Sequence, residues 1–246
     1  MAKLKDYIRR YLPLSAVIDT LRRRKLALLN PENWDDRNDR LFMQRYKEKK
    51  RLSSLYAMCA AVRHETHHHW RVFTPGAEGA CLELWRDPLE AALRESDSTR
   101  FQEVEYLTLP QVAQLGPKDL ENLPFYKRKG FGAEEEYRVI AWSGEPQALA
   151  LEFDIQLSWV KQIELNPWMP KPLFQSVKDT IKAIHGCDSI EFRQSTLIDN
   201  QQWRDAGDRV VGRKPGGPET TLSLKKRPTK KRRKRRRARK EWTGGS

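Results

Sequence analysis

Five consecutive positions, His64-Glu65-Thr66-His67-His68, match the H-E-x-x-H pattern of zinc-dependent proteases. In those enzymes the two histidines lie one helical turn apart and bind zinc, and the glutamate polarises a water molecule. Here the segment follows an expected strand, so His64 should lie at or before the start of the helix, on a different face from His68. We therefore predict no metal site. A metal-dependent hydrolase that uses His64 and His68 remains an alternative.

A second pattern places two basic residues ahead of three glutamates and an arginine, in KRKGFGAEEEYR (127–138). On a strand, Glu134, Glu136 and Arg138 project from one face, because side chains alternate with a period of two. Such a set can hold a cation or a phosphate, or its members can pair with one another as a structural ladder. Acid–base catalysis requires one carboxylate to be buried with a raised pKa. Glu134 and Glu136 are our catalytic candidates.

The Glu-x-Glu pattern, together with an arginine and the pair Ser195-Thr196, is also similar to ADP-ribosyltransferases. In that group the usual order is Arg, then Ser-Thr-Ser, then Glu-x-Glu, whereas here Glu134-x-Glu136 precedes Ser195. The chain contains neither a Walker-A loop nor a Gly-x-Gly-x-x-Gly fingerprint. The sequence therefore names no cofactor.

The charge of the chain is concentrated at its C-terminus. The 246 residues carry a formal net charge of +14, but residues 1–224 hold 34 basic and 32 acidic residues, a net charge of only +2. We expect the basic tail to be disordered when free and to bind RNA or DNA through its phosphates, since dense Lys and Arg release counterions from nucleic acid. The alternative is a solvated tail that binds any polyanion. The tail residues are Lys225, Lys226, Arg227, Lys230, Lys231, Arg232, Arg233, Lys234, Arg235, Arg236, Arg237, Arg239 and Lys240.

Composition also indicates where the domains begin and end and in which cellular compartment the protein is expected. The stretch DAGDRVVGRKPGGPE marks a boundary, so we predict a globular domain at 1–204, a linker at 205–224 and the tail at 225–246. No run of about 18 apolar residues predicts a membrane span, and the first 30 residues do not resemble a secretory signal. Three widely spaced cysteines exclude a disulfide framework and a Cys-x-x-Cys zinc site. A cytoplasmic protein is the simplest expectation.

These candidate residues need a scaffold, and the hydrophobic pattern predicts an α+β fold. We expect a single mixed or antiparallel sheet with flanking helices and a disordered basic C-terminal tail. The sheet has about seven or eight strands, with 148–153 as the hairpin partner of 134–142. The expected strands are 25–29, 55–62, 81–85, 101–107, 134–142, 148–153, 160–165 and 190–192. The expected helices are 3–12, 14–24, 40–51, 66–73, 87–94 (with Asp87 as N-cap) and 170–184, and 117–129 is helical or irregular.

Several motifs, taken in order, resemble a bacterial family known as domain of unknown function 2971, over roughly residues 14–203. The segment 127–138 matches the family pattern K-R-x-x-F-x-x-E-x-E-x-R. Asp36 and Asp39 match an acidic loop, although Arg37 stands where the family has proline. The other matching segments are LYAMCAAVRHETHHHWRVFTPGAEGACLEL (55–84), with Cys59, Trp70, Arg71, Phe73 and Gly79, then IELNPWMPKPLFQSVKDTI (163–181) and FRQSTL (192–197).

The resemblance implies a bacterial or phage intracellular protein, and it supplies no activity. It does imply that the shared polar residues form one pocket for an anionic ligand, such as a nucleotide or a nucleic-acid phosphate. Arg71 and Arg138 would then bind phosphate, and Glu134 or Glu136 would act as a base or orient an arginine. The competing interpretation is a non-enzymatic binding or regulatory module whose Glu/Arg cluster is structural. The remaining expected pocket residues are Asp36, Asp39, Trp70, Phe73, Lys127, Arg128 and Ser195.

Overall fold

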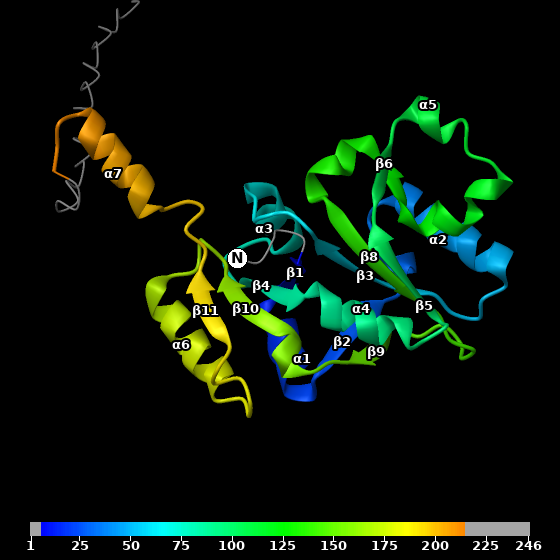
Figure 1. The fold of residues 1–246 in the computed structure, drawn as a ribbon, viewed down its shortest axis with the longest axis horizontal. Helices are drawn as coiled ribbons and strands as arrows, with labels where there is room; N and C mark the ends of the chain where they lie inside the picture. Colours follow the sequence, from blue (N-terminus) through cyan, green and yellow to red (C-terminus); the bar gives the residue numbers. More distant parts are fainter. Residues whose placement is uncertain (1–5, 215–246) are drawn as a thin grey trace, which may run out of the picture. The chain divides into compact units, whose positions relative to one another are not determined.

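A computed structural model describes residues 6–214 of the protein (Figure 1). The strands are β1 (Tyr7–Pro13), β2 (Lys25–Leu29), β3 (Tyr56–Ala61), β4 (Gly79–Trp85), β5 (Thr99–Glu103), β6 (Glu105–Leu107), β7 (Tyr126–Arg128), β8 (Glu136–Ala141), β9 (Ala150–Asp154), β10 (Val160–Leu165) and β11 (Glu191–Gln194). The helices are α1 (Leu14–Arg23), α2 (Arg37–Lys50), α3 (His67–Phe73), α4 (Arg86–Arg94), α5 (Leu109–Val112), α6 (Lys171–Lys182) and α7 (Gln201–Val210). The 3-10 turns are η2 (Pro31–Asn33), η3 (Pro117–Phe125), η4 (Lys129–Glu134) and η5 (Leu157–Trp159).

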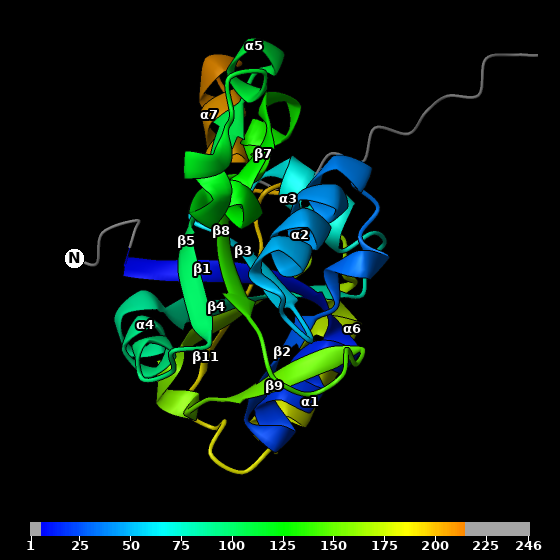
Figure 2. The same ribbon diagram turned by 90° about the vertical axis from the view of Figure 1, so that its right-hand side faces the viewer.

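Nine strands form one mixed sheet, which confirms the predicted α+β class with flanking helices. The order β11-β10-β4-β1-β3-β2-β9 forms its main path, and β8 pairs with both β3 and β5. The β10–β11 pair is parallel, and the other pairs of this sheet are antiparallel. Strands β6 and β7 form a separate parallel pair. In Figure 2 the blue strand β1 crosses the middle of the sheet.

The sheet opens at β3. One edge of β3 pairs with β8 over six residues, from Tyr56 to Ala61. Its other edge is shared between two strands: Arg9 of β1 lies opposite Ala61, and Leu29 of β2 lies opposite Ala57. Strands β1 and β2 therefore separate beside the middle of β3. This opening determines where the cavity described below is found.

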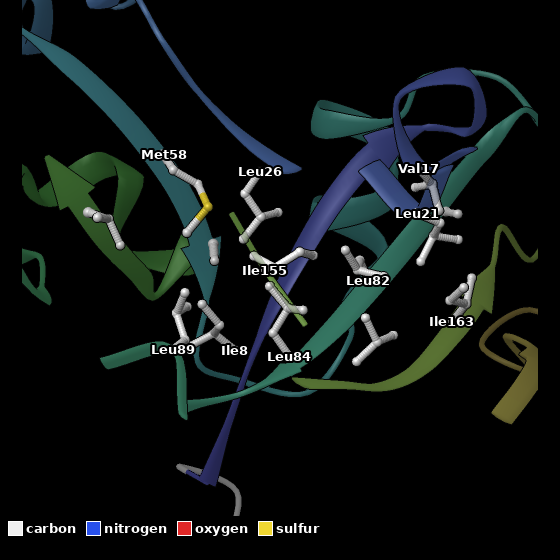
Figure 3. Packing of buried hydrophobic residues seen from close by; sticks show 14 of the residues in the cluster. Ile8, Val17, Leu21, Leu26, Met58, Leu82, Leu84, Leu89, Ile155 and Ile163 are labelled. Carbon is white, nitrogen blue, oxygen red and sulfur yellow. The ribbon is translucent and has the colours of Figure 1, made fainter. Parts of the chain in front are cut away.

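The main hydrophobic core lies on one face of the sheet. Helices α1, α4 and α6 cover that face. Val17 and Leu21 of α1 and Leu89 of α4 pack against the strands (Figure 3). Ile181 of α6 belongs to the same core. Helix α2 covers the other face of β3 and β8 through Met43. Helix α3 covers the same face beside β1 and β4. That second face carries the charged residues of the candidate site.

The predicted helix at 3–12 is wrong, because residues 7–13 form the central strand β1. Ile8 packs in the main core, whereas Arg9 next to it pairs with Glu83 of β4 at 2.9 Å. In the sequence, apolar residues that alternate with arginines resemble an amphipathic basic helix, although here they form a strand with a buried arginine on one face. The ion partner that stabilises the strand lies 74 residues away.

Three further expectations need correction. The strand predicted at 101–107 is divided into β5 and β6, because Val104 interrupts it and donates to the carbonyl of Glu136 at 2.8 Å. The expected hairpin of 134–142 with 148–153 is absent: β9 pairs with β2, and β8 lies between β3 and β5. Asp87 lies inside the first turn of α4, whose N-cap is Trp85. The strands predicted at 25–29, 55–62, 81–85 and 160–165 and the helices at 14–24, 40–51, 66–73 and 170–184 are confirmed to within a few residues.

The chain divides into two compact units, Met1–Asn200 and Gln201–Ser246. The first unit contains the sheet. The second begins with α7, so the segment predicted as linker from 205 starts inside a helix. The remaining part of that linker from 215 and the basic tail at 225–246 lie outside the described residues. Within residues 6–214 no helix is long and apolar enough to cross a membrane.

Candidate functional site

A cavity of about 450 Å³ lies where β1 and β2 separate beside β3. Strands β1 and β3 contribute Arg9–Leu12 and Ala57–Ala61 to its walls. The loop that precedes α2, the end of α3 and the segment around η4 complete it, the last through Lys127, Phe131 and Glu134. Strand β1, the loop that precedes α2 and the segment around η4 are far apart in the sequence, and they place polar residues around this one cavity.

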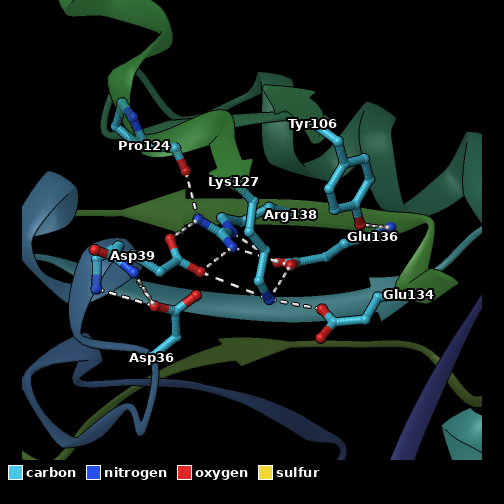
Figure 4. Close-up of polar contacts among 9 residues, drawn as sticks. Asp36, Asp39, Tyr106, Pro124, Lys127, Glu134, Glu136 and Arg138 are labelled. Atoms are coloured by element: carbon cyan, nitrogen blue, oxygen red, sulfur yellow. Dashed lines mark hydrogen bonds and ion pairs between the residues drawn. The ribbon is translucent and has the colours of Figure 1, made fainter. Parts of the chain in front are cut away.

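Arg138 of β8 joins the acidic residues beside the cavity (Figure 4). Its Nη1 and Nη2 each donate to a different oxygen of Asp39 at 2.7 Å, and its Nε donates to Glu136 at 2.6 Å. A further bond of 2.7 Å reaches the carbonyl of Pro124. The Arg138 side chain is completely buried, so this charge is available to its partners rather than to solvent.

Lys127 connects the remaining carboxylates. Its Nζ lies 2.6 Å from Glu134, 3.2 Å from Glu136 and 3.7 Å from Asp39 (Figure 4). Glu134 is 5% exposed and Glu136 is 4% exposed. The Lys127 ammonium group therefore lies within ion-pair distance of three buried carboxylates. With all groups ionised, the three carboxylates and the two cations Lys127 and Arg138 carry a formal net charge of −1.

The two glutamates differ in acidity although they share Lys127. Burial alone favours the neutral form of Glu136, but the charges of Arg138 and Lys127 outweigh it and lower its pKa to about 2. For Glu134, burial outweighs the charge of Lys127 and raises the pKa. Burial likewise raises the pKa of Asp39, against the opposing charge of Arg138. Glu136 is thus the more acidic of the two glutamates, and Glu134 holds its proton more readily.

The local sequence before α2 explains the position of Asp39. Asp36 is the N-cap of α2, and its Oδ1 accepts the backbone N–H groups of Asn38 and Asp39 at 2.9 and 3.4 Å. This cap places Asp39 in the first helical turn, facing β8. The second oxygen of Asp36, Oδ2, is buried and has no hydrogen-bond partner among the described residues.

A turn, rather than a strand, delivers Glu134. The chain forms the 3-10 turn η4 up to Glu134, and Glu135 then adopts a left-handed conformation with φ of 40° before β8 begins at Glu136. The expected strand from 134 is therefore two residues too long. The bend lets Glu134 and Glu136 both reach Lys127, while Glu135 forms an ion pair with Arg63. His69 of α3 supports the turn, since its Nε2 contacts the carbonyl of Glu134 at 3.1 Å.

Aromatic rings form part of the cavity wall. The Arg138 guanidinium lies 4.8 Å from the ring centre of Trp34, and the Lys127 ammonium lies 5.1 Å from that of Phe131. Phe73, at the end of α3, stacks against Tyr11 and lies partly exposed at the mouth. Flat apolar surfaces and charged groups therefore face the same space.

The structure brings together most of the predicted pocket residues but not all of them. Asp36, Asp39, Phe73, Lys127, Glu134 and Glu136 line the cavity, and Arg138 contacts two of them, Asp39 and Glu136. Arg71 does not line it: this side chain is exposed on α3 and stacks on Trp168, with its Cζ 3.7 Å from the ring centre. Arg128 is exposed at the end of β7.

Trp70 and Ser195 belong to a different cluster. Trp70 is completely buried, and its Nε1 donates to Glu65 at 2.7 Å. The hydroxyl of Ser195 bonds to the same Glu65 oxygen. These contacts connect α3 with the residue that follows β11, so Trp70 and Ser195 stabilise the scaffold and do not line the cavity.

The histidine pattern forms no metal site within residues 6–214, where no group of three or more His, Cys, Asp or Glu side chains is arranged to hold a metal ion. Helix α3 begins at His67 with Thr66 as its N-cap, so His64 lies outside the helix. His64 instead contacts Arg9, with 3.4 Å between Nδ1 and Nη2. The two histidines therefore do not share a helical face, as the position of the preceding strand predicted.

Several cavity residues were not identified from the sequence. Arg9 and Arg10 lie in the segment predicted as a helix, and Trp34 lies in a loop that carries no pattern of its own. A buried arginine pair within a strand gives no local signal, because both the strand and its partner are defined by the sheet. Phe131 does occupy the aromatic position of the family pattern at 127–138, which was the available indication.

No family model matches the sequence, and no curated protein matches it either. Solved structures of DarT from Thermus sp. 2.9 are similar in fold. The complex with NAD+ is 10% identical with a TM-score of 0.41, over 79% of this chain and 98% of that one. The complex with ADP-ribosylated single-stranded DNA is 9% identical with a TM-score of 0.43, over 79% and 96%. No activity follows from a likeness of this extent.

Proposed function

We propose that the domain binds a nucleotide, either free or within RNA or DNA, and that Glu134 transfers a proton during a reaction of that ligand. The observation that carries this proposal is the pair of buried glutamates on Lys127. Their surroundings push the two pKa values in opposite directions. Carboxylates with separated pKa values are a common arrangement for acid–base chemistry. A binding module with a structural cluster would instead favour exposed glutamates.

The cavity matches the parts of a nucleotide. A volume of about 450 Å³ is within the range of small-molecule sites. Trp34 and Phe131 offer flat surfaces for a base. Ribose hydroxyl groups can donate hydrogen bonds to carboxylates, and Glu134 has one oxygen on Lys127 and a second for such a contact. Together these features favour a ligand with a ring and several hydroxyl donors.

The basic tail adds a second element to the proposal. We propose that residues 225–240 hold nucleic acid through its phosphates and keep the substrate near the domain. Thirteen basic residues in that segment support this role, because each neutralised phosphate releases a counterion. The assignment to domain of unknown function 2971, and with it a bacterial origin, likewise stays a prediction from the motifs.

The test compares Glu134→Gln with Glu135→Gln in the full chain. Each protein is incubated with nucleoside triphosphates, NAD+, RNA or single-stranded DNA, and products are identified by mass spectrometry. We expect wild type and Glu135→Gln to convert one ligand class and Glu134→Gln to lose at least about 100-fold in rate, since general acid–base groups contribute that much or more. Equal rates in the two variants would overturn the role of Glu134. Failure of the wild type to convert any member of the panel would overturn the proposed ligand class.

A further inference from the structure

Three basic residues line the cavity, and the charges of two of them are neutralised by carboxylates of the protein itself. Arg9 pairs with Glu83 at 2.9 Å, and Lys127 pairs with Glu134 at 2.6 Å. Arg10 differs from both, because no carboxylate of the described residues forms an ion pair with it. The cavity thus contains one cation whose counterion is not supplied by residues 6–214.

Arg10 is also deeply buried, at 6% exposure. Its Nη2 crosses the opening between β1 and β2 to donate to the carbonyl of Ala27 at 2.6 Å. This is the only polar contact that the Arg10 side chain makes within the described part of the chain. A guanidinium has five N–H donors, so most of its capacity is unused. On either side of it along β1, Ile8 and Leu12 pack in the main core.

Such a residue is costly to the fold. A buried charge without a partner of opposite charge loses its hydration and gains little in return. Burial accordingly lowers the pKa of Arg10 to about 10. A structural role at the Ala27 carbonyl requires only a neutral donor. An anion that binds in the cavity would pair with the Arg10 charge and so offset the free energy lost when this charge is buried.

We infer that Arg10 binds a phosphate group of the ligand, so that the substrate class is a phosphorylated nucleotide rather than a nucleoside. This inference rests on the proposed function and orients the ligand. The phosphate lies in the opening between β1 and β2, and the ribose hydroxyls lie toward Lys127 and Glu134. Guanidinium groups suit this task, because their planar fork donates two bonds to neighbouring phosphate oxygens. Arg10 takes the role that the sequence had suggested for Arg71 and Arg138.

The experiment measures binding by calorimetry with full-length wild type, Arg10→Met and Arg10→Lys. The ligands are a nucleoside, its mono- and diphosphate, and inorganic pyrophosphate. Arg23→Met is the matched control, since Arg23 at the end of α1 forms an exposed ion pair with Glu152 of β9. The tail is present in every protein, so its binding of phosphates contributes equally. We expect wild type and Arg23→Met to prefer the diphosphate over the nucleoside by about 10-fold or more.

In Arg10→Met that preference disappears while nucleoside affinity is retained. Arg10→Lys keeps the charge but lacks the paired N–H donors of the guanidinium, so its preference for the diphosphate is reduced. This variant replaces Arg10→Met in the comparison if the methionine variant does not fold. A preference that is unchanged in the folded Arg10 variants would overturn the inference and leave the proposed function standing. Conversely, pyrophosphate that binds wild type but not Arg10→Met, with no binding of the nucleoside, would uphold the anion site and contradict the nucleotide.

Discussion

Arg138 and Asp39 form a two-pronged ion pair, with two hydrogen bonds of 2.7 Å each, although 99 residues separate them in the sequence. Arg138 lies on β8 and Asp39 in the first turn of α2, and both are buried. Neither charge is near water, so each depends on the other for its stability. The pair therefore fixes α2 on the sheet and sets the shape of the cavity beside it.

Removing one partner of this pair should destabilise the protein strongly. Asp39→Asn leaves the buried Arg138 with only Glu136 as a carboxylate partner among the described residues, and Arg138→Met leaves the buried Asp39 with only Lys127, 3.7 Å away. Removing one partner of a buried pair costs about 3 to 5 kcal/mol in comparable cases. Urea unfolding of each variant gives the free energy. The control is Arg23→Met, whose exposed pair with Glu152 contributes about 1 kcal/mol or less. Losses of similar size in all three variants would contradict the account of a buried pair.

Part of this site could be predicted from the sequence, because it depends on local spacing. Lys127, Glu134, Glu136 and Arg138 lie within twelve residues of one another and meet as the pattern indicated. Asp36 and Asp39 came from the family resemblance. The left-handed turn at Glu135 was not predicted, since a run of three glutamates contains no glycine or asparagine to mark it.

The misjudged elements share a cause. The sequence predicts a helix where β1 forms, because Arg9 and Arg10 resemble the polar face of a helix when their partners in the fold are unknown. Those partners, Glu83 and the Ala27 carbonyl, are set by the order of strands. The pairing of β9 with β2 follows from the same order, whereas the turn residues Gly144 and Pro146 locally favour a hairpin between β8 and β9. Local sequence patterns therefore could not predict which strands pair across long distances in the sequence.

Glu164 on β10 should make stability depend on pH near neutrality. The side chain is 1% exposed, and burial, aided by the nearby charge of Glu65, raises its pKa to about 7. Between pH 4.5 and 7 the unfolded chain ionises while the folded chain keeps its proton, so stability falls as pH rises through this window. The expected fall is up to about 3 kcal/mol. Unfolding at pH 5, 6, 7 and 8 should show this slope in wild type.

Glu164→Gln removes that titration, so its slope over the same window should be smaller. Arg193, which pairs with Glu164 at 2.9 Å, is present in both proteins. A double variant with Arg193→Gln separates the pairing from the burial. Identical pH slopes for wild type and Glu164→Gln would show that Glu164 is already ionised in the folded protein.

Gly79 at the start of β4 leaves no room for a side chain. A Cβ at this position would lie 2.3 Å from Cβ of Thr74, closer than real atoms approach. Gly79→Ala should therefore destabilise the protein by about 1 to 3 kcal/mol through overpacking. Gly144→Ala is the control, because nothing lies within 4 Å of a Cβ there. If thermal unfolding shows the same midpoint for both variants, the packing of α3 against β4 differs from this description.

Lys127 should set the acidic limb of ligand turnover. Its charge opposes the effect of burial on Glu134, so its removal raises the pKa of Glu134 further. In Lys127→Met the carboxylate then ionises only at higher pH, and the acidic limb of the rate profile moves up by about one unit or more. Lys127→Arg keeps the charge and should retain most of the wild-type profile. An unshifted limb in Lys127→Met would mean that another group controls the reaction.

The most direct test of the account is to locate the bound nucleotide. Full-length protein is irradiated with an azido-adenine nucleotide, and the labelled peptides are identified by mass spectrometry at physiological salt, which screens weak contacts. We predict label on the peptides that contain Trp34 and Phe131, competed by unmodified nucleotide and reduced in Arg10→Met. Label confined to residues 225–240 would contradict the central claim, because the tail alone would then bind the ligand.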